Sequence, residues 1–283
     1  MLWIAESVLA ALAVLLVWRL RRTASDWESL NRLLNGPGPL IAAALISAAA
    51  TWTVWRSLND VGTVHDEVSY LLQAQIFAHG KWTEPAAPIP AFFEQFHVFT
   101  DPVIASKYPP GHSLLLVPGI LLGLPGLVPL FLVALSGALV FALARRVANP
   151  WVALLTFFLW LVGRTELRFH SSYFSENTTT LCWLLGFWAL LEWRERREAR
   201  WLALLTACVA WGGITRPLTM AAFAIPTGIV VVWTLTRHRA WHWRAIGPAA
   251  AIGAAIIGIL LISNAKVTGN WRSMPWNVWS REY

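Results

Sequence analysis

The sequence has few cysteines and few charged residues, and both shortages narrow the class of protein. Only two of its 283 residues are cysteines, Cys182 and Cys208. Both lie inside apolar runs without a histidine pattern beside them, which favours small buried hydrophobic residues over a disulfide framework or a metal site. Charged residues make up 13% of the chain, about half the share that a soluble domain carries. An ordinary soluble globular domain is therefore excluded.

Apolar residues dominate instead, with 57% hydrophobic residues and 19 tryptophans. Runs close to the roughly 20 residues that cross a bilayer as a helix recur along the chain. They lie at 2–18, 39–57, 127–144, 177–191, 218–236 and 245–265, with shorter runs at 151–163 and 201–214. This pattern predicts an all-α integral membrane protein with about eight transmembrane helices. A run at 113–124 is broken by Pro118 and Gly119 and predicts an interfacial or half-inserted helix.

Arginines gather in alternate short connections, which indicates the orientation of the chain, because cytoplasmic connections of membrane proteins carry an excess of Lys and Arg. The formal net charge of +7 is then an orientation signal and does not indicate nucleic-acid binding. Both termini and the connection 58–112 are predicted to lie outside. The arginines assigned to the cytoplasmic side are Arg19, Arg21, Arg22, Arg32, Arg145, Arg146, Arg194, Arg196, Arg197, Arg200, Arg237, Arg239 and Arg244.

The connection 58–112 is the long polar segment of the chain, and a connection of roughly 55 residues usually carries function. It begins with a predicted interfacial helix that ends at Gly80 and whose apolar face is Val68, Leu71, Leu72, Gln75 and Ala78. The predicted organisation is an anchor helix with a cytoplasmic connection over 1–38, a transmembrane catalytic domain over 39–265, and an external tail over 266–283. The tail ends abruptly after several tryptophans, as in a truncated chain.

The acidic pair Asp66-Glu67 opens the interfacial helix, and its context admits two interpretations. One is a helix cap, because Thr63-Val64-His65-Asp66 fits a capping box. The other is a functional site, because the same connection closes on Lys107, Tyr108 and His112. A cation at the membrane surface would hold a lipid-linked phosphate whose charge otherwise faces hydrocarbon.

Further candidate residues lie outside this connection. Arg216 stands at the Thr215-Arg216-Pro217 break between two apolar runs, where its charge either snorkels to water or faces a cavity. Arg168 and His170, in the connector 164–176, would wall the same site or form a solvated turn. Of the histidines, His65 beside Asp66 is a candidate acid or base, whereas His97 is interpreted as a polar surface residue.

Three motifs in this order resemble the GT-C superfamily of membrane glycosyltransferases, in particular the bacterial branch similar to protein O-mannosyltransferases and lipid A sugar transferases. The first is Asp66-Glu67-x-x-Tyr70-x-x-x-Ala74-x-x-x-Ala78-x-Gly80. The second is Lys107-Tyr108-Pro109-Pro110-Gly111-His112, and the third is the apolar Leu114-Leu115-Leu116-Val117-Pro118-Gly119. Serial spans with short connections complete a likeness that covers residues 40 to 265.

The resemblance implies a polyprenyl-phosphate-linked sugar as donor and a hydroxyl of a lipid, glycan or protein as acceptor. It implies Asp66 as the catalytic carboxylate, a base or a metal ligand, with Glu67 assisting it. If a divalent metal is used, Asp66 and Glu67 would bind Mg²⁺, Mn²⁺ or Ca²⁺; otherwise no cofactor is expected. The implied location is a bacterial inner or plasma membrane with the active site on the extracytoplasmic side. The expected substrate-binding residues are Lys107, Tyr108, His112, Arg216, Arg168 and His170.

Two other classes remain open. A multi-span transporter or permease would suit a chain rich in glycine and proline, although coupled transporters bury acidic groups or histidines within the membrane and these spans carry few. The other class is a noncatalytic scaffold of a glycan export system, in which the connection 58–112 would bind only a partner.

Overall fold

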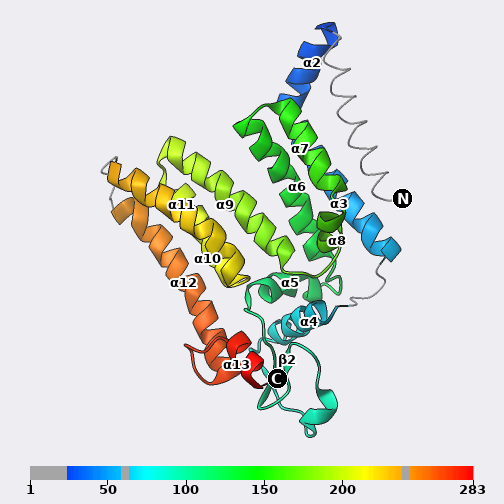
Figure 1. Cartoon of the computed structure of the whole chain (residues 1–283), viewed down its shortest axis with the longest axis vertical. Helices are drawn as coiled ribbons and strands as arrows, with labels where there is room; N and C mark the ends of the chain where they lie inside the picture. The colour runs from blue at the N-terminus through cyan, green and yellow to red at the C-terminus, as the bar shows by residue number, and fades with distance from the viewer. Residues whose placement is uncertain (1–23, 59–63, 238–242, 283) are drawn as a thin grey trace. The chain divides into compact units, whose positions relative to one another are not determined.

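The structure, a computed structural model, describes residues 24–58, 64–237 and 243–282. The chain divides into two compact units, whose elements are labelled in Figure 1. Unit 1 comprises residues 1–60 and 129–172, and unit 2 comprises residues 61–128 and 173–283. The described residues are mostly helical in both units, as the sequence predicts.

Unit 1 consists of helices packed on an aromatic core. Its described elements are α2 (Ala24–Asn35), α3 (Gly38–Leu58), α6 (Leu127–Val147, in this unit from Pro129), α7 (Pro150–Val162) and α8 (Arg164–His170). Phe141, Trp151 and Phe157 are buried together in the core. Asn149 is the N-cap of α7. Its side chain accepts hydrogen bonds from the backbone N–H groups of Trp151 and Val152, both at 3.0 Å.

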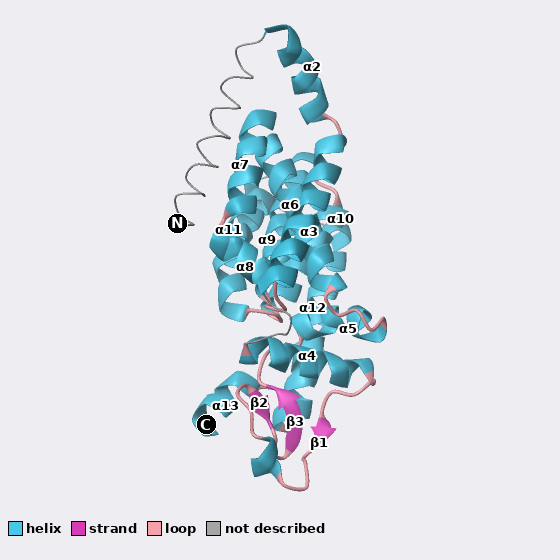
Figure 2. Ribbon diagram, turned by 90° about the vertical axis from the view of Figure 1, so that its right-hand side faces the viewer, coloured by secondary structure: helices cyan, strands magenta, loops and turns pink. Residues whose placement is uncertain are grey.

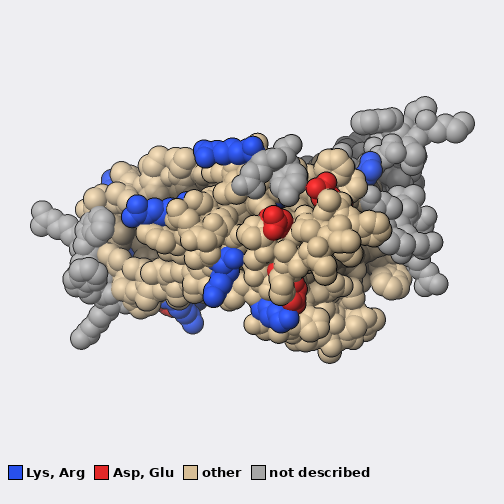
Figure 3. Space-filling model, turned by 90° about the horizontal axis from the view of Figure 1, so that it is seen from below, with Lys and Arg blue, Asp and Glu red and all other residues tan. Residues whose placement is uncertain are grey.

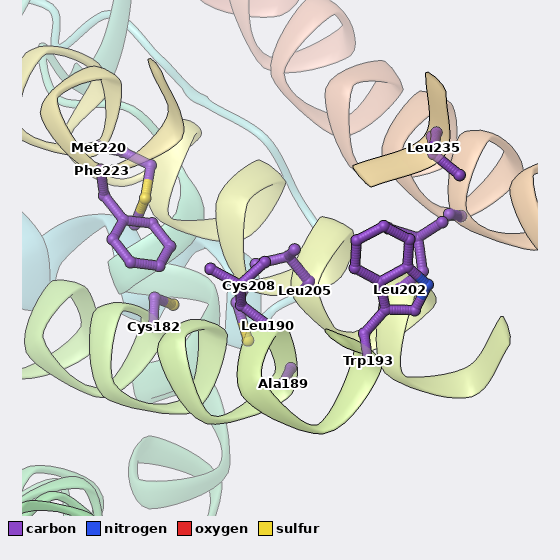
Figure 4. Close-up of a cluster of buried hydrophobic side chains, with 11 residues drawn as sticks. Cys182, Ala189, Leu190, Trp193, Leu202, Leu205, Cys208, Met220, Phe223 and Leu235 are labelled. Carbon is purple, nitrogen blue, oxygen red and sulfur yellow. The ribbon is translucent and has the colours of Figure 1, made fainter. Parts of the chain in front are cut away.

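The helices α9 (Glu176–Arg196), α10 (Ala199–Gly213), α11 (Pro217–Arg237) and α12 (Trp243–Thr268) form the helical part of unit 2 (Figure 1). The helix α10 contacts the three others. Figure 4 shows their shared apolar core, in which Cys182 and Cys208 lie among side chains such as Leu190 and Phe223. Both cysteines are buried free thiols, which confirms their interpretation as small hydrophobic residues.

The rest of unit 2 combines short helices with a small antiparallel sheet (Figure 2). The sheet has the order β1-β3-β2, with Glu84 opposite Ile104 and Val98 opposite Ser106. Because its strands are only two to four residues long, no alternating pattern in the sequence predicted it. The elements are α4 (His65–Ala78), β1 (Glu84–Pro85), the 3₁₀ helix η1 (Pro90–Phe93), β2 (Val98–Phe99), β3 (Val103–Ser106), α5 (Gly111–Leu121) and α13 (Pro275–Glu282).

The helix α4 confirms the predicted helix at the start of the connection. It is followed by Gly80, which has a φ of +74° that glycine adopts readily. Of the predicted apolar face, Val68 is exposed in the structure, whereas Ser69 and Gln73 on another face are buried. These two polar side chains pair with the sheet. Ser69 Oγ lies 2.7 Å from Ser106 Oγ, and Gln73 Oε1 accepts a 2.8 Å hydrogen bond from the Ser106 N–H.

Four described helices are long and apolar enough to cross a bilayer, over 38–55, 127–147, 217–237 and 246–268. These match four predicted spans, and the predicted span 2–18 lies outside the described residues. The predicted count of about eight is not confirmed. The helices α7 and α10 have only 13 and 15 residues, and α9 carries charged residues toward its C-terminal end. The apolar composition of α10 is also explained by its burial among three helices.

The helix α5 is the broken apolar run of the sequence. It has 11 residues with Pro118 inside, so it rises about 16 Å, roughly half the hydrocarbon thickness of a bilayer. This agrees with a helix that does not cross. Figure 3 shows one face of the molecule, on which charged side chains are few and scattered among uncharged ones.

Candidate functional site

Unit 2 contains a cavity of about 570 Å³, within the range of small-molecule sites. Its walls come from α4, the connection between β3 and α5, the start of α9, the break between α10 and α11, and the region of α13. Acidic, basic and aromatic side chains converge there from segments far apart in the sequence. Those that bear on its chemistry are Asp66, Tyr70, Tyr108, Glu176, Arg216 and Trp276.

Asp66 is held from the side of the sheet. Its Oδ1 accepts a 2.6 Å hydrogen bond from the Tyr108 hydroxyl and lies 2.9 Å from His97 Nε2. Among the described residues, Oδ2 has no hydrogen-bond partner. The predicted capping box depends on Thr63, which lies outside the described residues; the described N-cap is Val64, whose side chain makes no capping hydrogen bond. The carboxylate thus has one oxygen anchored and the other available to a ligand in the cavity.

Two tyrosines stand beside this carboxylate as protonated groups. Burial, together with the bond to Asp66, raises the pKa of Tyr108, so its hydroxyl stays a donor at neutral pH. Burial also raises the pKa of Tyr70, whose hydroxyl lies 3.0 Å from Ser175 Oγ. The two rings pack with centroids 4.8 Å apart. Together they form an aromatic floor next to Asp66.

Glu67 is not a wall of the cavity. Successive residues of an α-helix are rotated by about 100°, so neighbouring carboxylates face different surroundings. Glu67 is buried, and its Oε1 accepts a 3.1 Å hydrogen bond from the Tyr173 N–H. It therefore ties α4 to the segment before α9. The described residues contain no cluster of three or more metal-binding side chains. Metal dependence stays a prediction.

Arg216 lines the cavity, which favours the cavity interpretation of the sequence over snorkelling. It stands between α10 and α11 and forms an ion pair with Glu176 Oε1 at the start of α9. Both side chains are partly exposed, at 38% and 30%. A guanidinium has five N–H donors, so an ion pair with one carboxylate leaves donors for a second anion. The pairing fixes the orientation of the guanidinium toward the cavity.

The motif Pro109-Pro110-Gly111 brings this break and α5 together. The Gly111 N–H donates a 2.8 Å hydrogen bond to the Ile214 carbonyl. A Cβ at Gly111 would lie 2.8 Å from that oxygen and also against Thr215 Oγ1. Only glycine permits this approach, because it has no side chain. The glycine of the motif therefore sets the position of the segment that carries Arg216.

Lys107 is buried beside α13 and is not a wall of the cavity. Its Nζ lies 3.8 Å from the ring centroid of Trp279 and 4.3 Å from that of Trp276. Burial lowers the pKa of Lys107, and the nearby Asp66 opposes this shift in part. The ammonium is stabilised by the negative faces of the indole rings. In this arrangement Lys107 contacts aromatic side chains of α13 and does not face the cavity as expected for a phosphate-binding group.

His112 is buried and contacts two residues at and before the start of α9. Its Nδ1 lies 2.8 Å from Thr178 Oγ1 and its Nε2 lies 2.7 Å from the Tyr173 carbonyl. Burial lowers the pKa of His112 to about 4, so the ring is neutral at pH 7 and its Nε2–H donates to the carbonyl. Both ring nitrogens are thus engaged within the protein. His112 links α5 to the start of α9 and does not line the cavity.

Arg168 and His170 belong to α8 of unit 1, whereas the cavity is formed by residues of unit 2. Arg168 is exposed. His170 is buried, with its ring centroid 5.0 Å from that of Trp160. The cavity walls include neither residue.

Two further residues of the site were missed from the sequence. His97, interpreted as a surface residue, lies against Asp66, whereas His65 is exposed and packs on Phe96. Trp276 lies in the predicted external tail but lines the cavity. No local pattern marks either of them, because each reaches the site through a contact distant in sequence.

Residues 125–265 match a family model described as dolichyl-phosphate-mannose-protein mannosyltransferase. The matched segment includes Glu176 and Arg216, begins after Asp66 and ends before Trp276. No curated protein and no solved structure gave a match. The family match agrees with the GT-C resemblance of the sequence and does not distinguish its branches. Multi-pass membrane glycosyltransferases are therefore the class to which this helical chain is most clearly similar.

Proposed function

We propose that this protein is a membrane glycosyltransferase that transfers a sugar from a polyprenyl-phosphate donor to an acceptor hydroxyl. The observation that carries the proposal is the cavity, which holds an oriented guanidinium and a carboxylate whose Oδ2 has no partner in the described part of the chain. The family match over residues 125–265 supports the class and makes mannose the first sugar to test. The arginine distribution supports an extracytoplasmic site, and the family resemblance implies a bacterial inner or plasma membrane.

Arg216 binds the phosphate of the donor. A guanidinium forms strong, directional hydrogen bonds with phosphate oxygens, and these bonds strengthen as the leaving phosphate gains charge. Glu176 holds one edge of Arg216 and presents the remaining donors to the cavity. Lys107 adds positive charge near this region but is sequestered by indole rings, so Arg216 is the main phosphate ligand.

Asp66 acts as the base toward the acceptor. Its Oδ2 takes the proton of the acceptor hydroxyl while the acceptor oxygen forms a bond to the anomeric carbon. The bond between that carbon and the phosphate oxygen breaks, and its electron pair leaves with the phosphate. Tyr108 remains protonated and holds Oδ1 throughout. In this step Asp66 receives the proton, the acceptor oxygen receives the sugar, and the leaving phosphate carries the negative charge.

The aromatic side chains that line the cavity are suited to contact with the sugar itself. Trp276 is 48% exposed, and both it and Tyr108 line the cavity. An aromatic ring offers an apolar surface on which the apolar face of a sugar ring packs. We therefore extend the predicted catalytic domain, 39–265, to include α13. Of the predicted anchor region, 1–38, the described residues 24–38 contribute no wall to this cavity.

The test is donor-dependent labelling by the purified full-length protein in detergent. A panel of radiolabelled polyprenyl-phosphate sugars, mannose first, is offered together with peptide, lipid and glycan acceptors. The Asp66→Asn variant keeps the shape of the side chain but cannot accept the proton, so transfer should fall by about 10²- to 10⁴-fold. Asp101→Asn, at an exposed position in the turn between β2 and β3, is the matched control.

Transfer by the wild type and the control, lost in Asp66→Asn, would support the proposal. Equal transfer by all three proteins would remove Asp66 from the mechanism. If no donor is used and a labelled substrate instead crosses proteoliposome membranes, the protein is a transporter. If neither activity is found while deletion in the host stops glycan export, it is a scaffold.

A further inference from the structure

His97 has an unusual backbone conformation that the surrounding structure stabilises. Its φ is +70°, in the left-handed region that is uncommon for residues other than glycine, although asparagine, aspartate and histidine adopt it more often than the rest. Its carbonyl accepts a 2.8 Å hydrogen bond from Ser69 Oγ and a 3.0 Å bond from the Lys107 N–H. These bonds connect Ser69 of α4, and Lys107 just after β3, to His97 just before β2. A non-glycine residue kept in such a conformation points to a function for its side chain.

The ring of His97 is directed at Asp66. Nε2 lies 2.9 Å from Asp66 Oδ1, and the ring is flanked by Tyr108 and Trp279 at centroid distances of 5.6 and 5.5 Å. Burial, and then the charge of Lys107, lowers the pKa of His97, which favours the neutral ring. Nδ1 is buried with no partner among the described residues. The proton of the neutral ring therefore belongs on Nε2, where it bonds the carboxylate.

We propose that His97 is a positioning residue for Asp66: together with Tyr108 it fixes Oδ1, so that Oδ2 faces the acceptor hydroxyl. This inference rests on the proposed glycosyltransferase activity. Two donors from different directions, a ring nitrogen and a phenol, restrict rotation of the carboxylate about its Cβ–Cγ bond. A misplacement of a reacting group by about 1 Å can lower a rate by about 10²-fold.

Three substitutions distinguish the role of the His97 side chain from that of its backbone conformation. His97→Gly and His97→Asn suit a positive φ, but neither places a donor where Nε2 lies. His97→Gln tolerates the conformation less well but carries an amide N–H at about the reach of Nε2. His79→Ala is the matched control, because His79 is an exposed histidine at the end of α4.

The measurements are steady-state transfer rates and thermal unfolding of the full-length protein in detergent. We expect His97→Gly and His97→Asn to keep the unfolding temperature while kcat falls by about 10- to 100-fold and the donor KM changes by less than about threefold. His97→Gln should recover most of the lost kcat. A wild-type kcat in His97→Asn, or a loss in His97→Gln as large as in His97→Gly, would overturn the inference. The proposed function fails separately, if the wild-type protein transfers sugar from none of the polyprenyl-phosphate donors.

Discussion

Replacing Gly111 with alanine tests how the site is built, independently of its substrate. The added Cβ would lie 2.8 Å from the Ile214 carbonyl oxygen and 3.0 Å from its carbon, well inside ordinary contact distance. These atoms are backbone, so the first turn of α5 and the break that carries Arg216 must separate. Overpacking of this kind costs about 1–3 kcal/mol, and weakening the buried hydrogen bond from Gly111 to Ile214 adds about 1–2 kcal/mol.

The expected loss of about 2–5 kcal/mol corresponds to a decrease of roughly 5 to 15 °C in unfolding temperature. Intrinsic fluorescence in detergent would follow the transition, since the chain contains 19 tryptophans. Gly228→Ala is the control, because no atom lies within 4 Å of a Cβ at Gly228, in α11. Gly111→Ala should also lower sugar transfer through displacement of Arg216. An unfolding temperature equal to that of the wild type would refute the close approach described here.

Arg216→Lys keeps the positive charge but loses the planar guanidinium, which can bond Glu176 and phosphate at the same time. The kcat/KM for the donor should therefore fall by about 10²-fold in initial-rate assays. Wild-type kinetics in this variant, with Arg237→Lys as an exposed control, would exclude Arg216 as the phosphate ligand. The neutral buried His112 makes stability depend on pH. Its pKa is about 4 in the folded protein and 6.5 ordinarily, so between these values the unfolded chain binds a proton that the folded protein does not. The free energy of unfolding should therefore fall by up to about 3 kcal/mol as pH drops from 6.5 to 4, and His112→Gln should flatten this slope in thermal melts.

The sequence predicted those parts of the molecule that depend on local pattern. Apolar runs gave the helices of both units, and the break at Thr215-Arg216-Pro217 gave the cavity-lining arginine. The acidic pair was correctly located at the start of α4. Its two carboxylates differ in surroundings because Asp66 faces the sheet and Glu67 faces Tyr173. That difference depends on tertiary contacts that no spacing in the sequence contains.

Other features arise only from distant contacts. The small sheet depends on pairing between short strands, and His97 reaches Asp66 across that sheet. The predicted number of spans is not confirmed, because a helix that is apolar from burial among other helices resembles in sequence one that is apolar from contact with lipid. The helix α10 illustrates this ambiguity.

The aromatic surroundings of Lys107 make its side chain a chemical reporter for the C-terminal helix. An amine between two indoles is shielded from acylating reagents while α13 lies against it. Because burial is what lowers the pKa of Lys107, the uncovered amine would regain the properties of an ordinary exposed lysine and react as one. The rate at which Lys107 is labelled thus measures how often α13 lifts away, without any engineered probe.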